Sequence, residues 1–311
     1  MNPSTTESPA SPLDPQPQAT ASPVATRPFY WSVRRELWEN RSLYIAPLIV
    51  TALVLFATLL GMFRLPGKMR ALPADPAAAH AVVVRPFSLA PAPVMLATFL
   101  VGLFYSLDAL YGERRDRSIL FWKSLPVSDR TTVLSKAAIP LGLLPLIAFA
   151  LSVATFFVLL ALSTAVLWVS GVGPALLWTE VRFVQEPLIM LYGLTVHSLW
   201  FAPIYAWLLW VSAWARRTPV LWAALPLAIP LVEKLAFQTS YFGALLKYRV
   251  TGAMAEAFAV SPQRGGSGTL DGLSQLTPVR FLTAPGLWLG LALAALFLAA
   301  AVRLRRNREP I

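Results

Sequence analysis

The sequence predicts an all-α integral membrane protein with six transmembrane helices. Of its 311 residues, 57% are hydrophobic and 13% are charged, whereas soluble domains carry about 25% charged residues. The apolar residues gather in six long stretches, each near or above the roughly 20 residues that a helix needs to cross a bilayer. Lipid leaves open backbone groups without partners, and these runs lack the alternation of barrel strands, so helices are expected.

The chain divides into a tail, one membrane domain and a short C-terminal end. Residues 1–28 are rich in Pro, Ser, Thr and Ala and lack the apolar surface needed to fold, so we expect a disordered cytoplasmic tail. They also lack the apolar core of a signal peptide. Residues 29–306 form the predicted membrane domain, and residues 307–311 a second cytoplasmic tail.

An amphipathic helix is expected just before the first span. In residues 29–41, Val33 and Leu37 fall on one helical face with Trp38, and most of the charged residues fall on the other. We interpret this segment as a helix lying in the inner membrane interface, with Trp31 and Trp38 as anchors. The alternative is an ordinary juxtamembrane basic cluster that only sets the topology.

The six predicted spans are residues 43–63, 89–111, 139–169, 187–213, 219–237 and 285–302. The third is longer than a bilayer requires and carries Pro140 and Pro145 near its start. The loops expected on the outer side are residues 64–88, 170–186 and 238–284. Within the last, the semi-apolar residues 241–258 predict a short re-entrant or surface helix, and residues 263–268 predict a Gly/Ser turn.

The distribution of arginine and lysine orients these spans. With the N-terminus inside, the inner segments hold most of the cations and are also the shorter segments, as the positive-inside rule requires. Both termini are therefore expected in the cytoplasm. The bias towards Ala, Leu, Pro and Arg suggests a bacterial protein, and hence the cytoplasmic (inner) membrane.

The inner loop at residues 112–136 is the most informative segment. It holds the cations Arg114, Arg115, Arg117, Lys123, Arg130 and Lys136. Residues 118–125 alternate apolar and polar groups like a short surface helix, and Pro126 ends it. Phe121 and Trp122 are unusual in a bare solvent loop, whereas aromatic residues beside arginines suit a protein interface. The alternative is that these two rings enter the inner leaflet.

Several catalytic classes lack their motifs here. A phosphate-binding loop would need glycine at Met62 and Ser or Thr at Met69. Neither H-E-x-x-H nor G-x-S-x-G occurs, and the outer carboxylates Glu180 and Glu186 have no distinguishing spacing. Because these motifs are missing, we expect no enzyme activity of this chain itself. The chain also has no cysteine and only two histidines, so we expect no metal site.

Ionisable residues at membrane depth are candidates for function because they are costly there. The predicted spans contain Asp108, His197, Glu233 and Lys234. Asp108 fits a boundary residue that pairs with the basic loop after it, and His197 fits a hydrogen bond between helices better than a proton relay. Glu233 and Lys234 either reach the outer surface or need a partner in another helix or a wet cavity.

The layout of the spans and the sequence of the basic loop resemble the membrane subunit of type-2 ABC transporters, the ABC-2 permease family. The resemblance covers about residues 29–306 and rests first on six spans preceded by an amphipathic helix. It rests most specifically on LYGERRDRSILFWKSLPVSD at residues 110–129, followed by Lys136. The motif APGLWLG at 284–290, a final span and an arginine-rich end complete it.

The resemblance implies a coupling helix that docks on a separate ABC ATPase. Its contact candidates are Glu113, Arg114, Arg115, Ser118, Phe121, Trp122 and Lys123. ATP and Mg would then be bound by the partner, and this chain would bind no cofactor. Two such subunits, as a homodimer or as a heterodimer with a related permease, would line one export path for a hydrophobic or amphipathic cargo. Membrane lipid is a further partner, and no nucleic acid is expected.

Two other functions stay open. A membrane-embedded enzyme would require Asp108, His197 and Glu233 to converge in one cavity. A non-transporting accessory or sensory subunit could dock the same ATPase through the same loop.

Overall fold

The computed structural model describes residues 27–124, 127–259 and 272–307. Within these ranges the regular structure is helical, apart from an isolated antiparallel bridge between Phe258 and Leu276. The N-terminal half forms α1 (Pro28–Glu39), α2 (Ser42–Met62), α3 (Leu65–Arg70), α4 (Pro76–Leu89), α5 (Pro91–Asp108), α6 (Tyr111–Arg115), α7 (Ser118–Ser124), α8 (Asp129–Ala138), the π-helical turn η1 (Ile139–Leu143) and α9 (Leu144–Val169). The C-terminal half forms α10 (Ala175–Glu180), α11 (Gln185–Trp214), α12 (Pro219–Phe237), α13 (Tyr241–Ala257), the 3₁₀ turn η2 (Leu273–Gln275), α14 (Pro278–Thr283) and α15 (Pro285–Asn307).

Six helical segments are long and apolar enough to cross a membrane, and each overlaps one of the six predicted stretches, although the second and third extend well beyond them. They are Ser42–Met62, Ala78–Arg115, Asp129–Val169, Gln185–Trp214, Pro219–Phe237 and Pro285–Asn307. The prediction of an all-α architecture with six candidate spans is therefore confirmed. The spans could be predicted because a long run of apolar residues is visible in the sequence itself and does not depend on contacts with distant segments.

The segments expected on the outer side contain more helix than the sequence predicted. Residues 64–88 were expected to form a loop, but they contain α3 and most of α4. Proline at the first turn and the Ala-rich stretch that follows favour helix in α4. The helix predicted at 241–258 is present as α13. The predicted tail up to residue 26, the turn at 263–268 and residues 308–311 lie outside the described residues.

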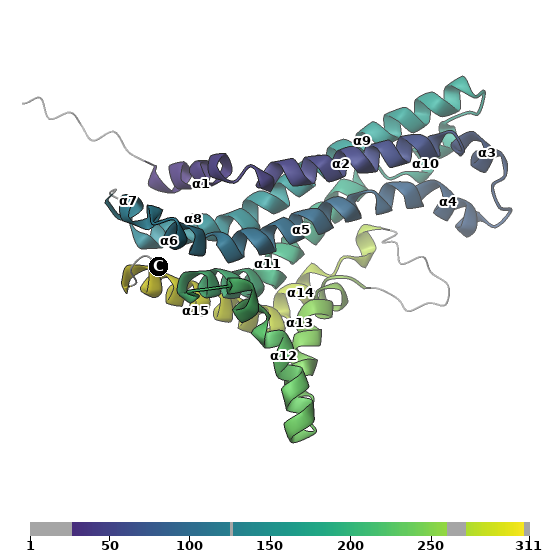
Figure 1. The fold of residues 1–311 in the computed structure, drawn as a ribbon. Coiled ribbons are helices and arrows are strands. Elements are labelled where there is room, and N and C mark those ends of the chain that lie inside the picture. Colours follow the sequence, from purple (N-terminus) through teal and green to yellow (C-terminus); the bar gives the residue numbers. More distant parts are fainter. Residues whose placement is uncertain (1–26, 125–126, 260–271, 308–311) are drawn as a thin grey trace, which may run out of the picture.

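The long helices pack around α11. It packs most extensively against α15, and α2, α5 and α9 pack against one another on its other side (Figure 1). Trp200 and Tyr205 of α11 are among the largest fully buried side chains of the described chain. Helices α1, α6, α7 and α8 gather at one end of this bundle with the end of α15, and α3, α4 and α10 gather at the other end (Figure 1).

A π-helical turn interrupts the third span. Pro140 and Pro145 both lack a backbone N–H, and between them Leu144 N–H donates to Ile139 O, five residues back. Helix α8 thereby continues into α9 through a widened turn. Such turns commonly occur at functional sites in helices.

Helices α12 and α13 form a hairpin that projects from the side of the bundle (Figure 1). No residue of α12 is buried, although its hydropathy is that of a membrane span. Apolar side chains left uncovered along a whole helix require a nonpolar environment, which lipid or a second polypeptide supplies.

Candidate functional site

Helix α7 presents an apolar surface at the end of the bundle where the basic loop lies. Ile119 is buried and holds the helix in place, whereas Leu120 and Phe121 are 59% and 60% exposed. The Trp122 ring packs edge-on against the Phe121 ring at 4.9 Å. The Arg35 guanidinium of α1 lies 3.8 Å from the centre of the Trp122 ring. Thus α7 is tied to α1 on one side and offers two apolar side chains on the other.

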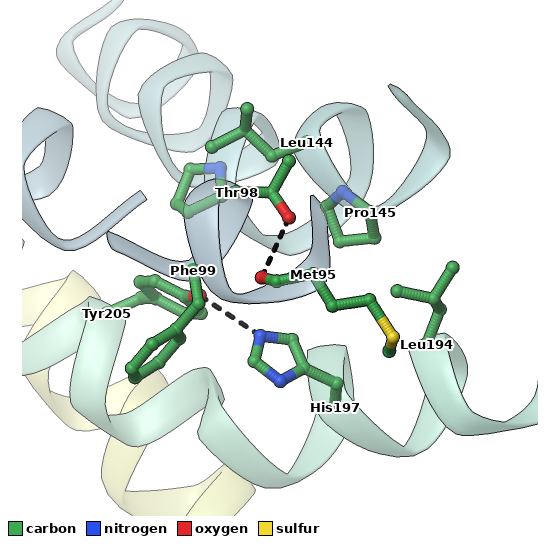
Figure 2. Close-up of a pocket in the computed structure, with 9 residues that line it drawn as sticks. Met95, Thr98, Phe99, Leu144, Pro145, Leu194, His197 and Tyr205 are labelled. Atoms are coloured by element: carbon green, nitrogen blue, oxygen red, sulfur yellow. Dashed lines mark hydrogen bonds between the residues drawn. The ribbon is translucent and has the colours of Figure 1, made fainter. Parts of the chain in front are cut away.

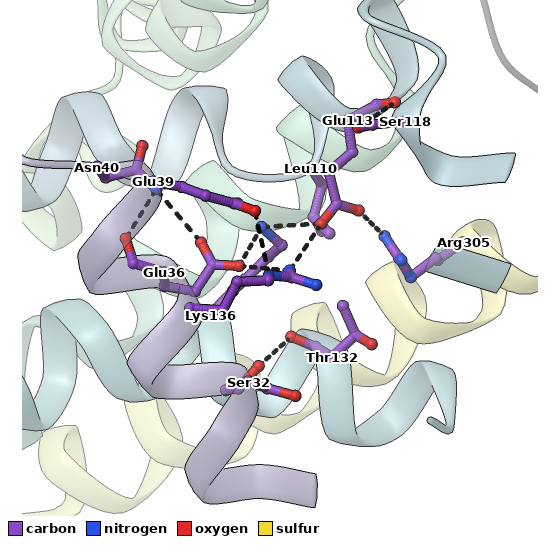
Figure 3. A network of polar contacts seen from close by, with 12 residues as sticks. Ser32, Glu36, Glu39, Asn40, Leu110, Glu113, Ser118, Thr132, Lys136 and Arg305 are labelled. Carbon is purple, nitrogen blue, oxygen red and sulfur yellow. Dashed lines mark hydrogen bonds and ion pairs between the residues drawn. The ribbon is translucent and has the colours of Figure 1, made fainter. Parts of the chain in front are cut away.

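A group of charged side chains that we call the ionic cluster lies near α7, which directly follows α6 and contacts Arg35 of α1. Its members come from four helices and are Glu36 of α1, Glu113 of α6, Lys136 of α8 and Arg305 of α15 (Figure 3). Glu36 is 1% exposed, Lys136 2%, Arg305 4% and Glu113 8%. Two carboxylates face two cations, so the charges of these four residues balance, as buried ionic groups require.

Lys136 is at the centre of the ionic cluster. Its Nζ lies 2.8 Å from Glu36 Oε1 and 3.1 Å from Glu113 Oε1. Arg305 Nη1 donates a short hydrogen bond to Glu113 Oε2, and Arg305 Nε lies 3.1 Å from Asp129 Oδ1. Each carboxylate is thus shared by cations of different helices, and displacement of one helix would break pairs with the others.

Glu36 has further partners. Tyr105 of α5 donates its hydroxyl hydrogen to Glu36 Oε2 at 2.8 Å, and Arg35 Nη2 lies 2.8 Å from Glu36 Oε1. Burial alone raises the pKa of Glu36, but the Lys136 ammonium and the Arg35 guanidinium outweigh it and hold this pKa below its ordinary value of 4.5. Glu36 is therefore a carboxylate at neutral pH.

Two contacts attach α6 to the end of α11. Arg114 Nη1 donates to the carbonyl oxygens of Ala213, at 2.6 Å, and Ala215, at 3.3 Å. Ser212 Oγ accepts hydrogen bonds from the backbone N–H groups of Leu110 and Tyr111, at 3.0 and 2.8 Å. The loop before α7 is therefore joined to the fourth candidate span as well as to α1, α8 and α15.

The seven predicted docking residues fall into two groups. Glu113 and Arg114 point inward and take part in the contacts just described, and Ser118 Oγ donates to the Glu113 carbonyl at 3.4 Å. The outer group is Arg115, Phe121 and Trp122. Arg115 pairs with Asp116 at 2.9 Å on the surface. The side chain of Lys123 lies outside the described residues.

The four ionisable residues of the predicted spans have separate surroundings. Asp108 lies 3.7 Å from Arg115 of the basic loop, and both side chains are exposed. Glu233 Oε1 and Oε2 accept the backbone N–H groups of Tyr241 and Phe242 at 2.6 and 2.9 Å, so Glu233 caps the start of α13. Lys234 is exposed on α12.

His197 borders a cavity of about 20 Å³ between α5, η1, α9 and α11 (Figure 2). Its Nε2 lies 3.1 Å from the Tyr205 hydroxyl, two turns along the same helix, and Phe99 of α5 packs edge-on against the imidazole ring. This volume accommodates about one water molecule. The cavity does not bring His197 together with Asp108 or Glu233, which have the different partners given above.

The sequence missed most of the ionic cluster. The helical pattern placed Glu36 on the charged face of an interfacial helix, but the structure buries it against Lys136 and Arg35, whose charges neutralise it. Arg305 was counted only as a basic residue of the C-terminal end. A signal was nevertheless present, since opposite charges recur at the inner ends of several predicted helices.

Among the described residues no group of three or more histidines and carboxylates is arranged to hold a metal ion. Comparison with protein-family models, with curated proteins and with solved structures gave no match. The functional assignment therefore depends on the residues of this chain and their geometry.

Proposed function

We propose that this chain is the membrane-spanning permease subunit of an ABC-type exporter, driven by ATP that a separate subunit hydrolyses. The observation that carries the proposal is the exposed apolar surface of α7, which is linked through α6 and Arg35 to a buried ionic cluster built from four helices. A partner that moved α7 would act on α1, α8 and α15 together. This is the mechanical requirement for a subunit that converts closure of an ATPase into rearrangement of its spans.

The docking surface in this proposal consists of Leu120, Phe121, Trp122 and Arg115. Exposed aromatic and aliphatic groups beside an arginine are the side chains that typically contribute most at protein interfaces. Glu113 and Arg114 would act from within the chain, by fixing α7 relative to Lys136 and the end of α11. The proposed docking therefore involves fewer exposed residues than the family resemblance implies.

The rest of the proposal follows the resemblance. The chain resides in a bacterial inner membrane with both termini in the cytoplasm, and it pairs with a second copy or a related permease. ATP and Mg bind to the partner ATPase, and the cargo is hydrophobic or amphipathic. The separate surroundings of Asp108, His197 and Glu233 favour this proposal over a membrane-embedded enzyme.

The test is co-expression of this chain with candidate ABC ATPases from the same genome, followed by co-purification. Wild-type chain should retain the ATPase through affinity purification, and Phe121→Ala with Leu120→Ala should lose it. The control is Phe63→Ala with Leu60→Ala, which changes exposed side chains (80% and 55%) at the far end of α2 and should retain the ATPase. If the α7 variant binds as the control does, the docking surface is elsewhere and the proposal fails. Stimulation of ATP hydrolysis by lipid-like cargo separates a transporter from an accessory subunit.

A further inference from the structure

An open groove of about 900 Å³ lies where α11 ends and α12 begins. Arg216 and Arg217 line it on the side of the connecting loop, and Trp214, Leu221 and Leu225 line it along the helices. The carbonyls of Ala213 and Ala215 beside it accept hydrogen bonds from Arg114 of the basic loop. The groove is therefore at the same end of the bundle as α7, which the cation distribution assigns to the inner leaflet.

The groove has uncompensated positive charge. Arg216 and Arg217 are exposed and form no ion pair with any described residue. No aspartate or glutamate occurs between Glu186 and Glu233 in the sequence. In addition, α12 begins here without a side-chain cap and without an acidic residue in its first turn. The positive end of the dipole of this 19-residue helix thus adds to the two guanidinium groups in favouring an anion.

The other wall of the groove is apolar and uncovered. Leu221 is 69% exposed, Leu225 45% and Trp222 43%. The Trp222 ring lies 4.9 Å from that of Trp214, so the two indoles form one surface at the mouth of the groove. Tryptophan is enriched at the level of lipid headgroups, with its polar edge towards water and its ring towards the acyl chains.

We propose that this groove binds an anionic phospholipid of the inner leaflet. The phosphate would lie between Arg216, Arg217 and the start of α12, and an acyl chain would lie along Leu221 and Leu225. A soluble anion would leave the apolar wall unused, and a zwitterionic lipid would bring its own cation to the two arginines. Lipid binding in the groove involves neither α7 nor the ATPase. A negative result for one of the two proposals therefore does not decide the other.

The experiment is native mass spectrometry of the full chain, released from detergent after incubation with phosphatidylglycerol or phosphatidylcholine. The wild-type chain should retain more phosphatidylglycerol than phosphatidylcholine. Arg216→Gln with Arg217→Gln should reduce its affinity roughly twenty- to thirtyfold, because one basic residue near an anionic headgroup contributes about a fivefold preference. Arg303→Gln with Arg306→Gln removes the same charge from exposed positions at the end of α15 and should leave the affinity unchanged.

Two further arms test the apolar wall and the nature of the occupant. Leu221→Asn with Leu225→Asn changes exposed side chains only and should also weaken retention of phosphatidylglycerol. Glycerol 3-phosphate, a headgroup without acyl chains, should not compete. The proposal is overturned if both lipids are retained equally, if the groove and control variants behave alike, or if glycerol 3-phosphate competes as well as lipid. If Leu221→Asn with Leu225→Asn abolished a dimer of the chain but left phosphatidylglycerol bound, the groove would be assigned to a second copy of the chain instead, and the proposal would be overturned.

Discussion

Lys136 Nζ lies 2.8 Å from Glu36 Oε1, and this pair joins the start of the third candidate span to the helix before the first. Both side chains are almost completely buried. The pair is one hundred residues apart in sequence, and each partner also contacts a further charged group, Arg35 for Glu36 and Glu113 for Lys136. The ion pairs of the cluster therefore hold α1, α6, α8 and α15 in their relative positions, and loss of one charge would weaken this arrangement.

Removing the carboxylate of Glu36 should destabilise the protein strongly. Glu36→Gln removes one of the two carboxylates that neutralise the buried Lys136 ammonium. Breaking a buried ion pair in this way costs about 3–5 kcal/mol of stability. Thermal unfolding in detergent measures the loss. Glu39→Gln on the exposed side of α1 is the control and should change stability by less than about 0.5 kcal/mol. Adding Lys136→Met to Glu36→Gln should recover part of the loss; no recovery would mean that the charge on Lys136 is not the cause.

The ionic cluster should make stability depend on pH in the acid range. The pKa of Glu36 is lower in the folded state than its ordinary value of 4.5, because the folded protein favours the carboxylate. Its stabilising contribution is thus fully present above pH 4.5 and is lost as pH falls from there through the lower folded-state pKa. Melting temperatures between pH 7 and pH 3 should stay level at first and then fall. In Glu36→Gln the fall should be smaller; an unchanged fall would assign it to other groups.

The proposed docking of α7 predicts a large effect from its aromatic residues. Truncating central aromatic residues typically costs about 2 kcal/mol or more at an interface, so Phe121→Ala with Trp122→Ala should weaken binding of the ATPase roughly thirtyfold. Titration of the purified ATPase against the variant measures the affinity. Because Trp122 also packs on Arg35 of α1, Phe121→Ala alone is the control for stability, and its exposed ring should leave unfolding as in wild type. Unchanged affinity would place both rings in the lipid interface instead.

The topology predicted from the cation distribution has a direct test. Reporter fusions after Pro66 and after residue 268 should report the outer side, and a fusion after Ser128 should report the cytoplasm. An outer signal at Ser128 would invert the orientation and with it the proposed contact with a cytoplasmic ATPase.

We expect Glu233 to stabilise the start of α13 and to have no effect on assembly with the ATPase. Its carboxylate accepts the N–H groups of Tyr241, Phe242 and Gly243 at the start of that helix. Glu233→Gln should therefore speed hydrogen exchange at these three amides, since the amide oxygen is a weaker acceptor than the carboxylate. Lys234→Gln, on the neighbouring exposed position, is the matched control. Exchange that is unchanged in Glu233→Gln would show that the cap contributes little.

The sequence by itself determined the features that depend on neighbouring residues. The six candidate spans follow from the length of the apolar runs, and α13 follows from a semi-apolar stretch of helical length. The short helix α7 was predicted from its alternation of apolar and polar positions, and it begins at Ser118 as expected. Each of these signals is contained within one segment, so no knowledge of distant partners was needed.

Only the tertiary structure decided which charges are buried and what they contact. The hydrophobic pattern of α1 placed Glu36 with the other charged residues, but the structure surrounds it with Lys136 and Tyr105 from other helices and with its neighbour Arg35. Glu113 was expected on the docking surface and Arg305 in a basic end, yet the two are buried partners 192 residues apart. The physical reason is that a charge is tolerated inside a protein only when opposite charges meet it there, and that meeting depends on how distant helices pack.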